Sequence, residues 1–292
     1  MSDTLIACIG KLNALHLGHL ALVRAAADQG CPVLVSFADI DQVMGWTPRQ
    51  PLLDPVERQR ILADWSTRIG APLREERLPF AAIQPLDAGV FLDHLRQHLG
   101  ISGLVCGPDF RCGRDRHADV TRLGEMAGDR GLSLAVVAPT VYQDQPISST
   151  RVRQAISAGD VATATAMLGR PYRLHGIIAH GDGRGRQLGY PTANLSDVGT
   201  LLPAPGVYAA RAMSADLNVA AAVNIGHSPT VGRERGLTIE AHLLDCQLDC
   251  YGAPLALELI ERIRDEQRFP SLNALTHQIA ADVEAVRQVL GR

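Results

Sequence analysis

Short apolar runs alternate with amphipathic segments through the first half of the chain. Each run is bounded by glycine or polar residues, as buried parallel strands are, and the runs lie at residues 5–9, 33–37, 104–106 and 132–137. Between them, apolar residues at helical spacing predict helices that begin near His16 and Asp54 and that span 86–99. Strands alternating with helices predict a parallel, doubly wound α/β sheet, whose ligand site lies beyond the carboxyl ends of its strands.

The pattern changes after Gly169-Arg170-Pro171. Short segments of alternating polarity follow without intervening helices, which predicts an antiparallel β-barrel of five or six strands; the segments are 172–179, 206–213, 218–225, 237–245 and 255–263. A terminal helix carries an apolar stripe that we interpret as core packing: Leu272, Leu275, Ile279, Val283, Val286 and Leu290. We therefore predict two domains, 1–168 and 169–292, with a short helix at 160–168 before the boundary.

Composition narrows the expected partners. The chain has 292 residues, a net charge of −3 and no basic tract, so we expect small phosphorylated ligands rather than nucleic acid. No apolar segment approaches the length of a membrane span, and the first run ends at Gly10 with no basic region before it, so we expect neither a membrane contact nor a signal peptide. Six cysteines without a C-x-x-C pair indicate a reducing cytoplasm, and Cys246 and Cys250 are poorly spaced for zinc. The sequence does not determine whether the chain forms an oligomer.

The stretch from Gly181 to Asn194 is the strongest candidate for a phosphate site. Four of its first nine residues are glycine, so backbone N–H groups can approach a bulky anion, and Arg184 and Arg186 add positive charge. After Pro191, Thr192 and Asn194 offer the oxygen ligands that a magnesium–nucleotide complex needs; the alternative is a flexible surface loop.

Two further candidates lie where predicted helices begin. His16 and His19 are three apart at a helix start, where free N–H groups favour nucleotide phosphates; the alternatives are a pair of surface histidines and, less favoured, a zinc site without a third ligand. Ser149, Thr150 and Arg153 form a second such group, which taken alone is a capped helix.

Glu240 is the candidate general base. It alternates with apolar residues and therefore faces away from the core, where a carboxylate in a polar cavity could accept a proton from a hydroxyl. The alternative is a solvated glutamate on a strand face. The polar loop at 224–230 is expected at the rim of the barrel.

The motif His16-x-Gly-His19, taken with Ser-Ser-Thr-x-x-Arg at 148–153, resembles the nucleotidyltransferase superfamily. The resemblance implies that His16 and His19 stabilise the transferred α-phosphate of ATP. It also implies that Ser149, Thr150 and Arg153 hold the triphosphate during an in-line attack by a substrate phosphate.

Four motifs of the second half closely resemble riboflavin kinase. They are Gly-Arg-Gln-Leu-Gly-Tyr-Pro-Thr-Ala-Asn (185–194), Pro-Gly-Val-Tyr-Ala (205–209), Asn-Ile-Gly-x-x-Pro-Thr (224–230) and Ile-Glu-Ala-His-Leu-Leu-Asp (239–245). The segment 263–269 fits as well. With the first half, nearly the whole chain resembles the bacterial bifunctional riboflavin kinase/FAD synthetase family, which phosphorylates riboflavin to FMN with magnesium–ATP and adenylylates FMN to FAD.

This resemblance implies a Rossmann-like nucleotidyltransferase domain with a parallel sheet, followed by an antiparallel β-barrel kinase domain with a terminal helix. Thr192 and Asn194 would coordinate magnesium–ATP, and Glu240 would activate the ribityl hydroxyl of riboflavin. The implied phosphate-covering positions of the loop are Gly181, Gly185, Arg186 and Gly189. The implied flavin contacts are Asp109 and Phe110 in the first domain and Arg264 and Phe269 in the second.

The first half departs from the family pattern in two places. The family's Gly-x-Phe-Asp-Gly-x-His is Gly-Lys-Leu-Asn-Ala-Leu-His at 10–16, so Asn13 replaces an aspartate and Ala14 a glycine that could adopt a positive φ. The family's Phe-x-Pro-His-Pro is Phe-Ala-Asp-Ile-Asp at 37–41, which brings in Asp39 and Asp41. One alternative is thus a riboflavin kinase whose N-terminal half uses another nucleotide or flavin, or is weakly active or inactive. Another is a flavin- or nucleotide-binding regulatory protein without turnover.

Overall fold

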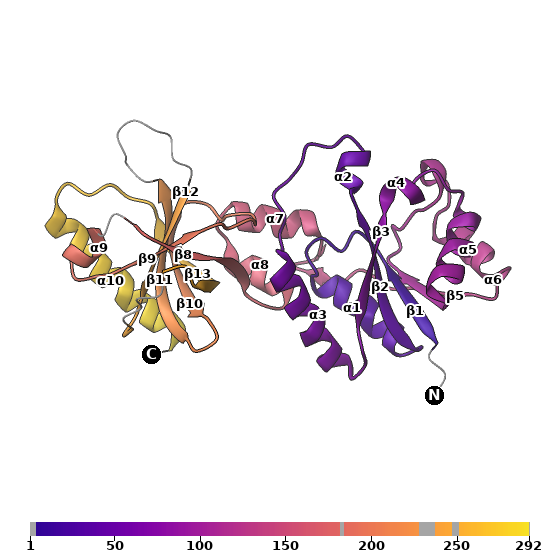
Figure 1. Cartoon of the computed structure of the whole chain (residues 1–292), viewed down its shortest axis with the longest axis horizontal. Coiled ribbons are helices and arrows are strands. Elements are labelled where there is room, and N and C mark those ends of the chain that lie inside the picture. The colour runs from indigo at the N-terminus through magenta and orange to yellow at the C-terminus, as the bar shows by residue number, and fades with distance from the viewer. Residues whose placement is uncertain (1–3, 182–183, 228–236, 247–250, 292) are drawn as a thin grey trace. The chain divides into compact units, whose positions relative to one another are not determined.

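The computed structural model describes residues 4–181, 184–227, 237–246 and 251–291, which belong to two compact units (Figure 1). The first unit comprises residues 1–49 and 55–148, and the second comprises 50–54 and 149–292. The units thus divide after Ser148 rather than after Leu168, because α7 (Ser149–Ser157) packs on α8 (Val161–Leu168) and α8 packs on barrel strands. The predicted domain limits at 168 and 169 stay a prediction for where the functional domains divide.

The first unit is built on a parallel five-stranded sheet with the order β3-β2-β1-β4-β5. Its strands are β1 (Leu5–Ile9), β2 (Cys31–Ala38), β3 (Arg74–Pro79), β4 (Ile101–Cys106) and β5 (Ser133–Val136). Because β1 lies between β2 and β4, the strand order reverses at β1, and the loops after β1 and β4 flank the crevice where such sheets bind ligands. The predicted doubly wound sheet is confirmed, but the edge strand β3 was not predicted, because its sequence Arg-Glu-Glu-Arg-Leu-Pro has no apolar run.

Side chains of β1 alternate between the two faces of this sheet, and helices cover both faces (Figure 1). Cys8 faces α1 (Leu17–Ala27), where its Sγ contacts the Leu22 carbonyl, and α3 (Pro55–Ile69) packs on α1. Ile9 faces the other way and shares a core with Phe91. That face is covered by α5 (Ala88–Leu99) and α6 (Val120–Gly128). The short elements of this unit are α2 (Ile40–Val43), α4 (Phe80–Ile83), a 3₁₀ turn (Arg114–Arg116) and the hairpin β6 (Val141–Tyr142) and β7 (Gln145–Pro146).

The second unit is a closed antiparallel barrel with the order β10-β11-β12-β9-β8-β13. Its strands are β8 (Tyr172–Ala179), β9 (Ala193–Ser196), β10 (Gly206–Met213), β11 (Asn218–His227), β12 (Leu237–Leu243) and β13 (Pro254–Asp265). The predicted barrel is confirmed, and the short strand β9 closes it by pairing with β8 on one edge and β12 on the other. The glycine-rich stretch is not wholly a loop, since α9 (Arg184–Gln187) forms one helical turn there and β9 begins at Ala193.

Helix α10 (Leu272–Leu290) packs on the outside of the barrel strands β10, β11 and β13. Its Ser271 cap accepts a hydrogen bond from the Ala274 N–H. Val286 is fully buried against Ala209, so the core interpretation of the stripe holds there. It is wrong for Leu272 in the first turn, which is 68% exposed.

Two observations on the described residues bear on the expectations from composition. The cysteines placed there are free thiols, and Cys8, Cys106 and Cys112 are buried; Cys250 lies outside the described residues. Across the same residues, no helix combines the length and the apolar character that a membrane crossing requires.

A buried ion pair joins α10 to β13. The Arg264 guanidinium donates to Asp282 through Nε at 2.8 Å and through Nη2 at 2.7 Å, and Gln278 donates to the same carboxylate at 2.9 Å. Asp282 is only 4% exposed, so its charge is compensated almost wholly by these partners.

Replacing Asp282 with alanine is therefore expected to weaken the attachment of α10 by about 3–5 kcal/mol, because it leaves the Arg264 charge buried without its carboxylate. Native-state hydrogen exchange of α10 and β13 peptides measures the loss. Asp245→Ala is the control, since Asp245 pairs with Arg287 of the same helix but is 71% exposed. Equal protection in the two variants would contradict the structural weight given to the buried pair.

Candidate active sites

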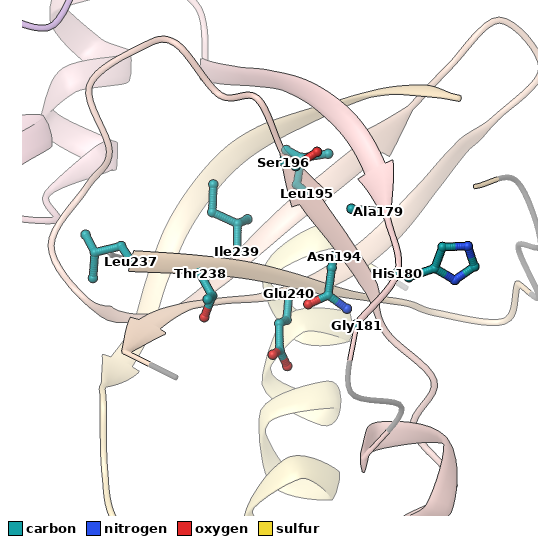
Figure 2. A pocket seen from close by; sticks show the side chains of 10 residues that line it. All are labelled: Ala179, His180, Gly181, Asn194, Leu195, Ser196, Leu237, Thr238, Ile239 and Glu240. Carbon is teal, nitrogen blue, oxygen red and sulfur yellow. The ribbon is translucent and has the colours of Figure 1, made fainter. Parts of the chain in front are cut away.

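The barrel contains a cavity of about 300 Å³ beside the glycine-rich stretch (Figure 2). Residues of β8, β9 and β12 and the chain just after β8 line it: Ala179, His180, Gly181, Asn194, Leu195, Ser196, Leu237, Thr238, Ile239 and Glu240. The cavity thus joins the predicted phosphate site to the predicted base.

Strand pairing brings Asn194 and Glu240 together. They are direct partners in the antiparallel pair of β9 and β12, so their side chains lie on the same face. Figure 2 shows Thr238, Glu240 and Asn194 extending to one side of their strands, whereas Ile239, which is 3% exposed, extends to the other. The predicted alternation is confirmed, and Glu240 faces the cavity rather than forming part of an open solvated strand face.

Two glycines are required by close backbone approach. A Cβ on Gly181 would collide with the Asn194 amide, and a Cβ on Gly185 would collide with the Tyr190 carbonyl and lie 3.3 Å from Thr192 Oγ1. Gly189 adopts a φ of +85°, which favours glycine. Residues 182–183, within this stretch, lie outside the described residues.

Thr192 is half-buried beside the cavity but is not among the residues that line it, and Arg186 is exposed. Sequence reasoning missed His180, which lines the cavity and stacks on Tyr251 with ring centroids 3.7 Å apart. The only indication in the sequence that His180 belongs to the site is its position directly before Gly181, the first residue of the glycine-rich stretch.

The donor set of this site fits a magnesium ion shared with a nucleotide. Thr192 and Asn194 supply hydroxyl and amide oxygens, which are hard ligands of the kind that magnesium prefers, and the Glu240 carboxylate faces the same cavity. Throughout the described part of the chain, no cluster of three or more His, Cys, Asp or Glu residues is arranged to hold a metal. Magnesium usually keeps several waters and substrate phosphates as ligands, so a sparse protein donor set suits it.

In the first unit, His16 and His19 lie together at the start of α1. Their rings stack with centroids 3.7 Å apart and planes at 16°, and the His16 backbone N–H donates to His19 Nδ1 at 3.3 Å. His16 is 6% exposed, so the pair is not the surface pair given as the alternative. The two histidines form a capping box at the first turn of α1, and the start of a helix favours an anion.

The loop between β1 and His16 is strained. Leu12 and Leu15 are fully buried and have φ values of 50° and 45°, a conformation that costs a residue with a side chain about 1–3 kcal/mol. Ala14, where the family has glycine, is buried and is not among the described residues with a positive φ. The left-handed turns of this loop therefore lie on either side of Ala14.

A buried ion pair holds this loop. Arg58 of α3 donates to the Leu12 carbonyl at 3.0 Å and to both oxygens of Glu75 on β3, at 2.6 and 2.5 Å. Ser36 of β2 also donates to Glu75. Although burial raises the pKa of Glu75, hydrogen bonds from Arg58 and Ser36 and the charges of Arg58 and Arg77 hold it below its ordinary value.

Asp39 is a structural residue in this unit. With a φ of 52°, it turns the chain after β2, and its Oδ1 accepts a hydrogen bond from the Phe80 N–H at 2.9 Å. The Phe37 and Phe80 rings meet edge to face beside it, with centroids 5.6 Å apart. One of the two new carboxylates is thus engaged at the start of α4.

Positive charge gathers near the end of β1. Lys11 Nζ lies 4.4 Å from the centroid of the Trp46 ring. Burial lowers the pKa of Lys11, the charges of Arg116 and Arg49 lower it further, and Asp41 opposes them. This edge of the sheet therefore favours an anionic ligand.

The loop after β4 carries the other predicted residues of the first unit. The Phe110 N–H donates to the Gly107 carbonyl at 3.2 Å, and the Phe110 ring packs partly into the core. Burial raises the pKa of the Cys106 thiol to about 11, and the charge of Asp109 also raises it. Asp109 itself is exposed. The Asp109 side chain is thus accessible to a ligand, whereas the Phe110 ring is only partly accessible.

The predicted residues of α7 lie in the second compact unit. Ser149 and Thr150 begin the helix, and Arg153 Nη1 donates to the Gln50 carbonyl at 2.7 Å within the same unit. Their union with His16 and His19 in one phosphate site stays a prediction.

The remaining predicted residues lie at the end of β13. Arg264 lies over the Phe269 ring, 5.6 Å from its centroid, but its guanidinium is held by Asp282. The predicted polar loop at 224–230 is wrong for 224–227, which form the end of strand β11, and residues 228–230 lie outside the described residues. A flavin contact of Arg264 and Phe269 stays a prediction.

Replacing Glu75 with glutamine should destabilise the first unit by roughly 1.5–3 kcal/mol at neutral pH, the usual contribution of a hydrogen-bonded charge. Because folding lowers the pKa of Glu75, its stabilising contribution is present above the ordinary value of 4.5 and is lost as the pH falls through the lowered value. The variant should therefore lose less stability on acidification than the natural chain. Both tryptophans, Trp46 and Trp65, lie in this unit, so their fluorescence in urea reports it.

The half-exposed neighbour on the same strand supplies the control, since Glu76→Gln should leave the acid dependence unchanged. An acid loss as steep in the Glu75 variant as in the natural chain would contradict the assignment.

Known proteins match the chain across both units. The family described as riboflavin kinase matches residues 168–290, and the family described as FAD synthetase matches residues 2–151. The bifunctional riboflavin kinase/FMN adenylyltransferase of Escherichia coli strain K12 is 34% identical over 292 residues, covering 97% of this chain and 92% of that protein. The protein of the same description from Bacillus subtilis strain 168 is 31% identical over 296 residues, with the same coverage of both.

A solved structure agrees in fold. It is described as a macrolide-efflux protein from Streptococcus pneumoniae, has a TM-score of 0.86 and 28% identity, and covers 98% of this chain and 95% of that chain. This likeness concerns fold and sequence. With a riboflavin kinase domain and a FAD synthetase domain in one chain, the protein is a transferase that belongs to the bifunctional riboflavin kinase/FMN adenylyltransferase family.

Proposed function

We propose that the barrel phosphorylates riboflavin to FMN with magnesium–ATP, and that the first unit adenylylates FMN to FAD with a second ATP. The observation that carries the proposal is the pairing of Asn194 with Glu240 at a cavity of about 300 Å³, where the absence of a side chain on Gly181 leaves room for the Asn194 amide. A carboxylate and an amide facing one cavity suit the transfer of a phosphoryl group to a hydroxyl.

In the kinase step, Glu240 accepts the proton of the ribityl hydroxyl as the hydroxyl oxygen attacks the γ-phosphorus of ATP. The bond from that phosphorus to the β–γ bridging oxygen breaks, and ADP leaves. Magnesium, when bound, neutralises charge on the phosphates, and Thr192 and Asn194 would hold it. The loop positions Gly181, Gly185, Arg186 and Gly189 cover the phosphates with backbone N–H groups and one guanidinium. Arg264 and Phe269 border the flavin.

In the adenylyl transfer, an FMN phosphate oxygen attacks the α-phosphorus of ATP and pyrophosphate leaves. His16 and His19, at the start of α1, stabilise the charge that develops there. Ser149, Thr150 and Arg153 hold the triphosphate; the flavin ring lies against Asp109 and Phe110. Engagement of Asp39 with Phe80 supports an active first unit, because that carboxylate is held by the fold.

ATP and free thiols together support a cytoplasmic location, where ATP is made and thiols stay reduced. The proposed partners are the small molecules riboflavin, FMN and ATP.

The purified chain is expected to convert riboflavin, ATP and magnesium first to FMN and then to FAD, measured by chromatography. Glu240→Gln should lower FMN formation by roughly 10²- to 10⁴-fold, the usual contribution of a general base. FAD formation from supplied FMN should continue, because Glu240 lies in the barrel.

Three outcomes would correct the proposal. In the first outcome, ATP supports the formation of FMN but not of FAD, whereas added CTP or GTP yields a flavin dinucleotide. That result would show that the first unit uses a nucleotide other than ATP. FMN alone with every nucleotide would leave a riboflavin kinase. Tight riboflavin binding without any product would instead indicate a regulatory binding protein.

Gly181→Ala is expected to lower FMN formation by about 100-fold, because its new Cβ displaces the Asn194 amide from the cavity and such displacements are costly in catalysis. Gly199→Ala is the matched control: a Cβ there meets no atom within 4 Å, and activity should be unchanged. Full kinase activity in the Gly181 variant would show that Asn194 is not needed where the structure places it.

A further inference from the structure

The polar face of β12 carries three side chains with different partners. Thr238 donates to the Gly226 carbonyl at 3.1 Å, and Glu240 faces the cavity. His242, next on the same face, reaches the end of the glycine-rich stretch, where its Nδ1 lies 2.8 Å from the Pro191 carbonyl oxygen. A carbonyl only accepts hydrogen bonds, so His242 donates from a protonated Nδ1.

The His242 ring makes a second contact with the same segment. It meets the Tyr190 ring edge to face, with centroids 5.4 Å apart and planes at 79°. The Tyr190 N–H in turn donates to the Gly185 carbonyl at 2.8 Å, at the turn of α9. The His242 imidazole therefore contacts both residues that precede Thr192: the carbonyl of Pro191 and the ring of Tyr190.

Thr192 is consequently held from both sides. His242 holds the carbonyl of Pro191 before it, and the pairing of Ala193 with Ala241 holds the chain after it. All of these contacts come from β12, the strand that carries Glu240. The distance between the Thr192 hydroxyl and the Glu240 carboxylate is therefore set through one rigid strand rather than through the glycine-rich loop.

We propose that His242 is a positioning residue of the kinase site, which holds the Thr192 hydroxyl where the magnesium–ATP complex needs it. It acts through Pro191 and Tyr190 and does not take part in proton transfer. This inference rests on the proposed kinase activity of the barrel. Without the imidazole, the segment ahead of Thr192 loses its hydrogen bond to β12 at Pro191, and the hydroxyl is less often in place.

Three variants of the full chain separate the hydrogen bond from the ring contact. His242→Asn places an amide N–H close to the position of Nδ1 but has no ring. His242→Phe keeps the edge-to-face contact with Tyr190 but cannot donate. His242→Ala loses both.

The Phe and Ala variants should lower kcat for FMN formation by roughly 10- to 100-fold, as small misplacements in an active site do, and raise the magnesium concentration needed for half-maximal rate. The KM for riboflavin should stay close to that of the natural chain, and the Asn variant should retain kcat within about threefold. Adenylylation of supplied FMN by the same samples is the internal control, because His16 and His19 lie in the other unit.

A Phe variant with natural kcat and natural magnesium dependence would overturn the proposal. So would an equal loss in all three variants with no change in magnesium dependence, which would indicate a role in folding alone. A natural chain that forms no FMN would overturn the kinase assignment itself, and with it this inference.

Discussion

The pairing of β9 with β12 is the constraint on which the kinase site depends. β9 is only four residues long, yet it determines that Asn194 faces Glu240. A slip of one residue would turn every β9 side chain to the opposite face and remove Asn194 from the cavity. Closure of the barrel opposes such a slip, because β9 is hydrogen-bonded to β8 on its other edge as well.

The first unit positions its site by other means. Its histidines follow a loop in which Leu12 and Leu15 adopt left-handed conformations, and such strain persists only where the surroundings over-determine it. Burial of both side chains and the bond from Arg58 to the Leu12 carbonyl supply that support. The barrel thus relies on strand register, whereas the sheet relies on a buried ion pair beneath a strained loop.

Local pattern was enough to predict what depends on neighbouring residues. Alternation along β12 gave the correct face for Glu240, and the apolar runs gave the parallel sheet. The strand β3 could not be found this way, because its Glu75 is stabilised by an ion pair with Arg58, which lies 17 residues away in the sequence. The role of Asp39 was equally hidden, because the N–H that it binds belongs to Phe80, 41 residues further along the chain.

The departures from the family pattern can now be weighed separately. Asp39 accepts a hydrogen bond from the Phe80 N–H at the start of α4, so one of its carboxylate oxygens has a structural role in the turn after β2. Ala14 needs no positive φ, because Leu12 and Leu15 make the turns. Asn13 is exposed, and its replacement of an aspartate removes a negative charge from the edge where Lys11 and Arg116 already interact. Asp41 adds a negative charge at the same edge, where it acts on Lys11, so these two changes offset one another in formal charge. The basic residues Lys11, Arg49 and Arg116 remain at this edge to attract polyphosphate.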